Sequence, residues 1–230
     1  MTDYDDFAVA YARSNESNLF NAHYARPEVV RLLGDLRGRR VLDVGCGSGT
    51  LTESLVEQGA VVTGSDRSAA MVELARERLG DRAELDVVDL SSPLPYADAS
   101  FDDAVACLVL HYVQDWSAPL AELRRVLRPG GRVVVVVNHP TAHAVVYPDA
   151  DYFATREYSE DYEFDGRTVW LTFWHRPLHA MSDAFTEAGF RIGTISEPPP
   201  APGTPVELLP PGLEPGRSFI CFLFMVLEAV

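Results

Sequence analysis

Short apolar runs alternate with amphipathic stretches along the first 138 residues of the chain. The runs are rich in Val, Leu and Ala, have the length of buried strands, and lie at residues 40–45, 60–66, 85–89, 103–110 and 132–138. Stretches of helix length lie between them at residues 51–58, 68–79 and 116–127, the second with Ser68 placed as its cap. This alternation predicts an α/β fold with a parallel sheet covered by helices on both faces.

The pattern changes after Asn138. Residues 139–176 are rich in aromatic and acidic side chains, and Asp165-Gly166 between two alternating segments is typical of a two-residue hairpin turn. A helix at 177–188, a strand at 190–196, a proline-rich loop and an apolar strand at 218–227 complete the prediction. We expect one domain over residues 1–230, divided into N-terminal lid helices (1–38), a cofactor-binding core (39–138), a substrate-cap insertion (139–176) and the rest of the sheet (177–230).

Composition narrows the class of protein. With 47% apolar and 10% aromatic residues the chain is globular, and its longest apolar stretch is far too short to span a bilayer. All 19 basic residues are arginines scattered among 34 acids, and a net charge of −15 disfavours nucleic acid as a partner. An odd set of three distant cysteines indicates neither a disulfide framework nor a metal site. The N-terminus lacks the features of a signal peptide, so we expect a cytoplasmic protein without a membrane partner.

The segment VLDVGCGSGT holds the strongest functional signal. Gly45, Gly47 and Gly49 follow a predicted strand and precede a helix, which lets backbone amides approach a ligand. Asp66 ends the next predicted strand, 21 residues beyond Gly45, where an acid can accept hydrogen bonds from ribose hydroxyls. Hydrogen bonds to charged groups contribute roughly 1.5–3 kcal/mol each. A tight turn alone would explain the glycines, but together with Asp66 they indicate an adenosine-containing cofactor.

The glycine spacing differs from the dinucleotide pattern G-x-G-x-x-G. The chain resembles the class I S-adenosylmethionine-dependent methyltransferases that act on small molecules. The resemblance covers residues 40–140 through VLDVGCGSGTLT, VTGSDRSAAMVELAR, DVVDLSSPLPYADASFD, CLVLHYVQDW and LRRVLRPGGRVVVVVNHP. It implies a Rossmann-like, seven-stranded, mostly parallel sheet with an antiparallel last strand, and SFICFLFMVL suits that strand. It also implies S-adenosylmethionine as cofactor, with S-adenosylhomocysteine as product.

The resemblance implies a role for each matching residue. Gly45, Cys46 and Gly47 would surround the methionine moiety, and Asp43 would orient its amino group. Asp66 would hold the ribose, with Arg67 and Met71 beside the adenine. Asp89, expected to end the third strand, would accept from the adenine amino group, with Leu90 next to it, and Leu108 would offer a carbonyl to the ammonium. Core packing is the alternative for Met71 and Leu108.

The segment SNESNLFNAHYARP, residues 14–27, precedes the first strand. Leu19, Phe20 and Tyr24 recur at helical spacing, while the asparagines between them suit polar recognition. The resemblance implies a lid over the cofactor, and we expect Tyr24 to reach the cofactor's carboxylate. The alternative is a solvated helix with Tyr24 packed on the sheet edge.

Candidate acceptor-side residues follow the later strands. His111, His139 and His175 are expected at the carboxyl edge of the sheet, where one of them could act as a base if the acceptor must lose a proton. Each could equally be structural. Aromatic side chains suit a flat, largely apolar acceptor, and the candidates are Phe20, Tyr112, Tyr147, Trp170 and Trp174.

We therefore predict a methyltransferase for a small, aromatic or apolar acceptor, methylated on carbon, nitrogen or oxygen, in natural-product biosynthesis. We expect a monomer or homodimer without a metal. An NAD-linked oxidoreductase would need a second domain. A methylase of nucleic-acid amino groups or of protein glutamine tends to carry an Asn/Asp-Pro-Pro-Tyr/Phe motif where CLVLHY stands. A binding protein without catalysis is a further alternative.

Overall fold

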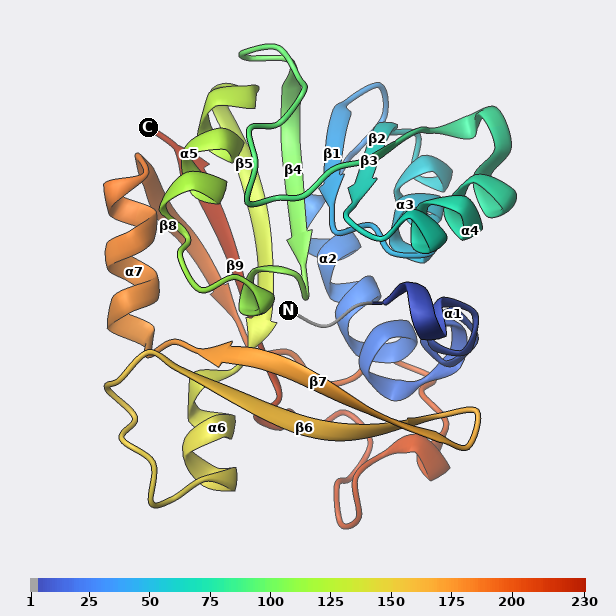
Figure 1. Ribbon diagram of the computed structural model, residues 1–230, viewed down its shortest axis with the longest axis vertical. Coiled ribbons are helices and arrows are strands. Elements are labelled where there is room, and N and C mark those ends of the chain that lie inside the picture. The colour runs from blue at the N-terminus through green and yellow to red at the C-terminus, as the bar shows by residue number, and fades with distance from the viewer. Residues whose placement is uncertain (1–3) are drawn as a thin grey trace.

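The computed structural model describes residues 4–230, whose main feature is a seven-stranded sheet. Its order is β3-β2-β1-β4-β5-β9-β8 (Figure 1). The strands are β1 (Arg40–Val44), β2 (Val61–Asp66), β3 (Glu84–Val87), β4 (Phe101–Cys107), β5 (Leu127–Asn138), β8 (Phe190–Ser196) and β9 (Phe222–Ala229). Strands β1 to β5 pair in parallel, and β9 is antiparallel to both β5 and β8. The predicted Rossmann-like fold, including the antiparallel last strand, is confirmed.

Helices cover both faces of this sheet. They are α2 (Arg26–Leu33), α3 (Thr50–Glu57), α4 (Ala69–Leu79), α5 (Ser117–Val126) and α7 (Leu178–Glu187). Side chains of β5 alternate between two cores: Val133 and Val135 join the side chains of α5 and α7, whereas Val134 joins those of α2 and α3. All three valines are fully buried, so the continuous apolar run fits a strand covered on both sides.

The N-terminal segment covers one part of the carboxyl edge of the sheet (Figure 1). It contains η1 (Asp5–Phe7), α1 (Ala8–Ser17) and η2 (Leu19–Ala25), which is a π-helix. A π-helix is wider than an α-helix, so the spacing of its faces differs. Leu19 and Tyr24 are buried, whereas Phe20 remains 43% exposed. The expectation that all three share one packed face is therefore wrong for Phe20.

A second, two-stranded sheet forms the predicted hairpin. It joins β6 (Arg156–Phe164) to β7 (Arg167–His175). Asp165 and Gly166 both have positive φ, 50° and 74°, as the two-residue turn requires. The hairpin extends across the carboxyl edge of the main sheet toward α1 (Figure 1). Phe7 stacks on Phe164 at 5.7 Å between ring centroids, and Arg13 pairs with Asp165 at 2.6 Å.

Shorter elements complete the described part of the chain. They are η3 (Gly80–Arg82), η4 (Leu110–Tyr112), α6 (Pro140–Val146) and η5 (Val206–Leu208). Within residues 4–230, no helix combines the length and apolar character needed to cross a membrane. The same range holds no group of three or more His, Cys, Asp or Glu side chains arranged for a metal ion.

Several predicted strand boundaries were wrong. Strand β4 ends at Cys107 rather than at residue 110, and β5 begins at Leu127 rather than at residue 132. Strand β3 ends at Val87, so Asp89 lies beyond it rather than at its end. There Asp89 accepts a hydrogen bond from the backbone amide of Ser91 at 2.9 Å, and this side-chain turn replaces strand pairing. Strand β9 begins at Phe222 rather than at residue 218, because the preceding residues still belong to the loop.

Candidate functional site

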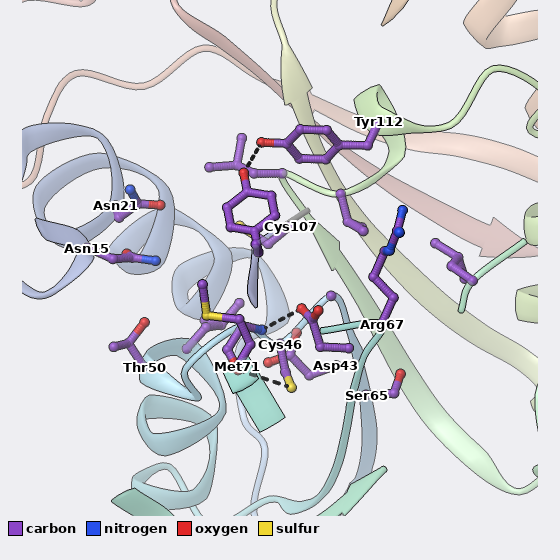
Figure 2. A pocket seen from close by; sticks show the side chains of 18 of the residues that line it. Asn15, Asn21, Asp43, Cys46, Thr50, Ser65, Arg67, Met71, Cys107 and Tyr112 are labelled. Carbon is purple, nitrogen blue, oxygen red and sulfur yellow. Dashed lines mark hydrogen bonds between the residues drawn. The ribbon is translucent and has the colours of Figure 1, made fainter. Parts of the chain in front are cut away.

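A pocket open to solvent lies where the strand order of the sheet reverses. Strands β1, β2 and β4 contribute Asp43, Asp66 and Cys107 to its wall, each at or near the carboxyl end of its strand. The N-terminal segment forms the opposite wall (Figure 2). This is the position at which open α/β sheets bind ligands.

The glycine turn forms the floor of the pocket. Gly45 and Gly47 both have positive φ, 75° and 54°, which glycine adopts without strain. A Cβ on Gly45 would lie 2.6 Å from the side chain of Val109, so a larger residue would displace the neighbouring strand end. The amides of Gly45 and Cys46 donate to the carbonyl of Ser65 at 2.7 and 2.9 Å. The turn is thereby held to β2.

Asp66 is fixed against this turn. Its Oδ2 accepts from the amide of Gly47 and its Oδ1 from the amide of Ser68, both at 2.9 Å. Burial raises the pKa of the Asp66 carboxyl, and these amide donors oppose that effect. Each carboxylate oxygen keeps a second acceptor position. The side chain is oriented in advance to accept hydrogen bonds from a ligand in the pocket.

Asp43 carries an unpartnered oxygen in the pocket wall. The side chain is 1% exposed, and its Oδ2 accepts from Thr52 Oγ1 at 2.7 Å, but its Oδ1 has no hydrogen-bond partner. Burial raises the pKa of the carboxyl to about 6. Buried polar atoms without partners are rare in proteins, and a carboxylate oxygen facing a pocket suits a cationic donor. The ammonium group of S-adenosylmethionine fits this requirement.

Leu108 follows β4 with a positive φ of 56°, a strained conformation for a residue with a side chain. Its amide donates to the carbonyl of Val136 at 2.8 Å. The ring of His111 hydrogen-bonds to the backbone of Leu108, and its Nδ1 accepts from the amide of Asn138 at 3.3 Å. Burial lowers the pKa of His111 to about 3, so the ring stays neutral. His111 therefore joins the ends of β4 and β5, and it does not line the pocket.

The pocket brings together many of the residues named from sequence. Those that line it are Asp43, Gly45, Cys46, Gly47, Asp66, Arg67, Met71, Asp89, Leu90, Leu108 and Tyr112. They come from the ends of β1, β2, β3 and β4 or the turns that follow them, from the first turn of α4 and from η4. The prediction of Ser68 as the cap of α4 is also confirmed, because its Oγ accepts from the amide of Met71 at 3.1 Å.

The other two candidate histidines lie elsewhere. His139 caps α6 by accepting from the amide of Thr141 at 3.1 Å, and its Nε2 lies 2.9 Å from Glu197 Oε1. His175 Nε2 lies 2.8 Å from the carbonyl of Tyr152, and its ring stacks on His143 at 4.1 Å. Neither lines the pocket, so their position favours the structural alternative over a catalytic base.

Most of the aromatic candidates also lie outside the pocket. Tyr24 is buried in a stack with Phe219 and Phe222, because the π-helix turns it toward β9. The expected contact of Tyr24 with a cofactor carboxylate is not compatible with this placement. Trp170 and Phe20 are surface residues, 64% and 43% exposed. Tyr147 bonds to Glu160 at 3.2 Å, and Trp174 is half-buried on the hairpin, outside the pocket lining.

Sequence reasoning missed Arg26, two residues beyond Tyr24. The guanidinium of Arg26 lines the pocket, and its Nη2 donates to the carbonyl of Asn15 at 3.1 Å. Within residues 4–230 it pairs with no carboxylate, although burial lowers its pKa. A half-buried cation without an anion suits a ligand carboxylate. The signal was present in the sequence, since Arg26 stands in the segment already singled out.

Asn15 and Asn21 of the same segment also line the pocket. So do Tyr4 and Tyr11, which were not singled out. The spacing of Tyr4, Phe7 and Tyr11 follows a helical face and could have indicated that the N-terminus packs onto the domain.

Comparison with known proteins agrees with this site. Residues 42–135 match the methyltransferase domain family. A demethylmenaquinone methyltransferase of Tropheryma whipplei is 38% identical over 136 residues, 58% of this chain and 56% of that protein. A ubiquinone biosynthesis O-methyltransferase of Alkalilimnicola ehrlichii is 36% identical over 129 residues, 54% of this chain and 52% of that protein. The chain thus spans about half the length of the curated relatives it matches.

Solved structures extend the likeness over the whole fold. An S-adenosylmethionine-dependent methyltransferase of Mesorhizobium loti is 26% identical with a TM-score of 0.66, covering 88% of this chain and 96% of that chain. A protein of Listeria monocytogenes with 21% identity shares the fold at a TM-score of 0.71, over 90% and 96% of the two chains. Residues 42–135 therefore carry a methyltransferase domain, and the chain shares its fold with a solved S-adenosylmethionine-dependent methyltransferase.

Proposed function

We propose that this chain transfers a methyl group from S-adenosylmethionine to a small acceptor that carries an aromatic ring or is largely apolar. The observation that carries the proposal is the charge arrangement of the pocket. A pre-oriented acid, a buried acid with an unpartnered oxygen and an unpaired arginine lie around one glycine turn. These groups complement the ribose, the ammonium and the carboxylate of this cofactor.

Each residue has a proposed role. Asp66 accepts from the ribose hydroxyls, Asp43 from the ammonium group, and Arg26 donates to the carboxylate. Arg67, Met71, Asp89 and Leu90 surround the adenine, and Leu108 presents its carbonyl toward the ammonium. When bound, the cofactor supplies an electrophilic methyl group on a sulfonium. The task left to the protein is to align the acceptor with that group, which is the main source of rate in such a displacement.

The acceptor side of the pocket is aromatic and apolar. Tyr4, Tyr11, Tyr112, Val109 and Val113 line it there. The relatives named above act in menaquinone and ubiquinone biosynthesis, and this supports an oxygen-bearing aromatic acceptor. The names of these relatives support a quinone-like acceptor more than an acceptor from natural-product biosynthesis. Neither the pocket nor the relatives favour an NAD-linked oxidoreductase or a macromolecule methylase. A cytoplasmic location and a monomeric or homodimeric state remain predictions.

The test is calorimetric titration of the purified chain with S-adenosylhomocysteine, beside a titration with NAD. We expect micromolar binding of the sulfur nucleoside alone. Asp66→Ala should weaken it at least about 100-fold, since two hydrogen bonds to a charged group are lost. Asp81→Ala, an exposed acid outside the pocket, is the matched control. Binding of NAD but not of S-adenosylhomocysteine would contradict the proposed function.

A further inference from the structure

Two tyrosine hydroxyls meet at the edge of the pocket. Tyr4, just before η1, and Tyr112, at the end of η4 and labelled in Figure 2, lie 2.5 Å apart at their oxygens. Their rings stand edge to face at 89° and 5.9 Å. Both tyrosines line the pocket, so this contact forms part of its wall. We call it the Tyr4–Tyr112 pair.

The pair keeps a hydrogen-bond donor that the protein does not use. In a contact between two hydroxyls one donates and the other accepts, so the hydrogen of the accepting hydroxyl stays available. Neither hydroxyl has another hydrogen-bond partner within residues 4–230. Tyr11 adds a phenol beside the pair, with its ring 5.0 Å from that of Tyr4.

The pair faces the middle of the pocket. In Figure 2 Arg67 lies on one side of the pocket and Asn15 and Asn21 on the other, and Tyr112 stands across from Asp43 and Cys46. Arg67, proposed beside the adenine, and segment 14–27, which carries Arg26, therefore lie on opposite sides of the region that the pair faces. An acceptor must come close to this region to be methylated.

The surrounding side chains offer no base at this place. The described lining contains no histidine, lysine or glutamate, and its three acids all belong to the proposed cofactor contacts. Burial raises the pKa values of Tyr4 and Tyr112 well above that of free tyrosine, so both phenols stay protonated and can only donate to an anion. An acceptor that arrives ionised would need no base.

We propose that the Tyr4–Tyr112 pair binds an ionised oxygen of the methyl acceptor, a phenolate or an enolate, and thereby positions the acceptor in the pocket. The inference rests on the proposed function, because it takes the pocket to hold the methyl donor. Hydrogen bonds from neutral donors to a charged oxygen are about twice as strong as those between neutral groups, and this difference selects the anion.

The experiment uses 4-nitrophenol as the probe, because its phenolate absorbs visible light and its phenol does not. The probe is titrated with the chain saturated with S-adenosylhomocysteine, at the pH where half of the free probe is ionised. We expect binding to raise the ionised fraction. Tyr112→Phe and Tyr4→Phe should each weaken phenolate binding about tenfold and remove this rise. The matched control is Tyr162→Phe, which lies in the same aromatic cluster but bonds to Glu160 outside the pocket.

The outcomes separate this inference from the function on which it rests. If the chain binds S-adenosylhomocysteine but never favours the ionised probe, the pair has no such role, although the proposed function stands. If both variants bind S-adenosylhomocysteine less tightly yet still favour phenolate, the pair only fastens the N-terminal segment, and the inference is wrong. Thermal unfolding of each variant shows whether it folds. If one variant does not fold, the phenolate binding of the other tests the inference. Failure of the unsubstituted chain to bind S-adenosylhomocysteine contradicts both proposals.

Discussion

Single residues in the pocket combine burial with incomplete pairing. Asp43 is buried with one unpartnered oxygen, and the partly buried Arg26 pairs with no carboxylate within residues 4–230. Such groups destabilise a fold unless a ligand completes them. Their arrangement is therefore better explained by binding than by stability, and it permits two predictions.

Arg26→Gln should weaken binding of S-adenosylhomocysteine about 10- to 100-fold, because a charge-assisted contact with its carboxylate is lost. Binding of adenosine, which lacks that carboxylate, should stay unchanged. Tyr24→Phe should leave both affinities unchanged, since its hydroxyl lies away from the pocket. Calorimetry measures the affinity of the unsubstituted chain and of each variant for both ligands. Equal losses for both ligands in Arg26→Gln would show that Arg26 does not contact the carboxylate.

The pH dependence of binding should follow Asp43. Its pKa in the folded protein is raised to about 6, so the carboxylate that attracts an ammonium is present above that pH and is lost below it. Affinity for S-adenosylhomocysteine should be level above pH 6 and fall up to about tenfold per unit below it. Asp66 also lies near and has a raised pKa, so the comparison needs Asp43→Asn, which should bind weakly with a flatter profile. An unchanged profile in that variant would assign the titration to another group.

The elements around the pocket differ in how firmly they are attached to the rest of the domain. The sheet and its turn are fixed by backbone pairing, whereas η1 and α1 attach through side chains. Phe7 packs against Phe164 of the hairpin, and Glu16 pairs with Arg78 of α4 at 2.5 Å. Segments held by few side-chain contacts open at a lower free energy than the core. The N-terminal segment is therefore the element expected to open when ligands exchange.

Phe7→Ala should speed the release of S-adenosylhomocysteine several-fold while lowering the melting temperature little, because it loosens the contact between η1 and the hairpin. Stopped-flow displacement measures the release rate. Val9→Ala is the control, since Val9 is 59% exposed on the neighbouring helix α1. A large loss of stability without faster release would mean that η1 belongs to the cooperative core.

The sequence predicted elements better than it predicted the placement of side chains. The hairpin turn followed from Asp165-Gly166 alone, and the period-two alternation of strand β7 places Leu171, Phe173 and His175 together on its buried face. Which face packs inward depends on the main sheet, and no local rule supplies that information. The sequence predicted that Tyr24 would face the cofactor, whereas Arg26 lines the pocket in the structure. This error has a similar origin, because α-helical spacing was assumed for a segment that forms a π-helix.

At the scale of the whole molecule, the α/β alternation and the glycine turn with Asp66 were predictable because they depend on local pattern and glycine geometry, whereas the antiparallel last strand followed only from the family resemblance. The histidines were placed at the correct edge of the sheet, yet the pocket lies at the reversal of strand order between β1 and β4. His139 and His175 belong to other elements, one after β5 and one ending the hairpin. The distance of each histidine from the pocket along the carboxyl edge depends on the order of the strands. The alternation of strands and helices in the sequence does not specify that order.

The strand order also bears on how the chain folds during synthesis. Every residue that lines the pocket precedes residue 114, whereas β9, the strand that joins β8 to the sheet, lies at Phe222–Ala229. Until β9 emerges from the ribosome, the outer edge of β5 has no partner, and unpaired edges are sites of aggregation. The cofactor pocket belongs to the half that is synthesised first. A ligand in this pocket therefore contacts only residues that are synthesised before β9.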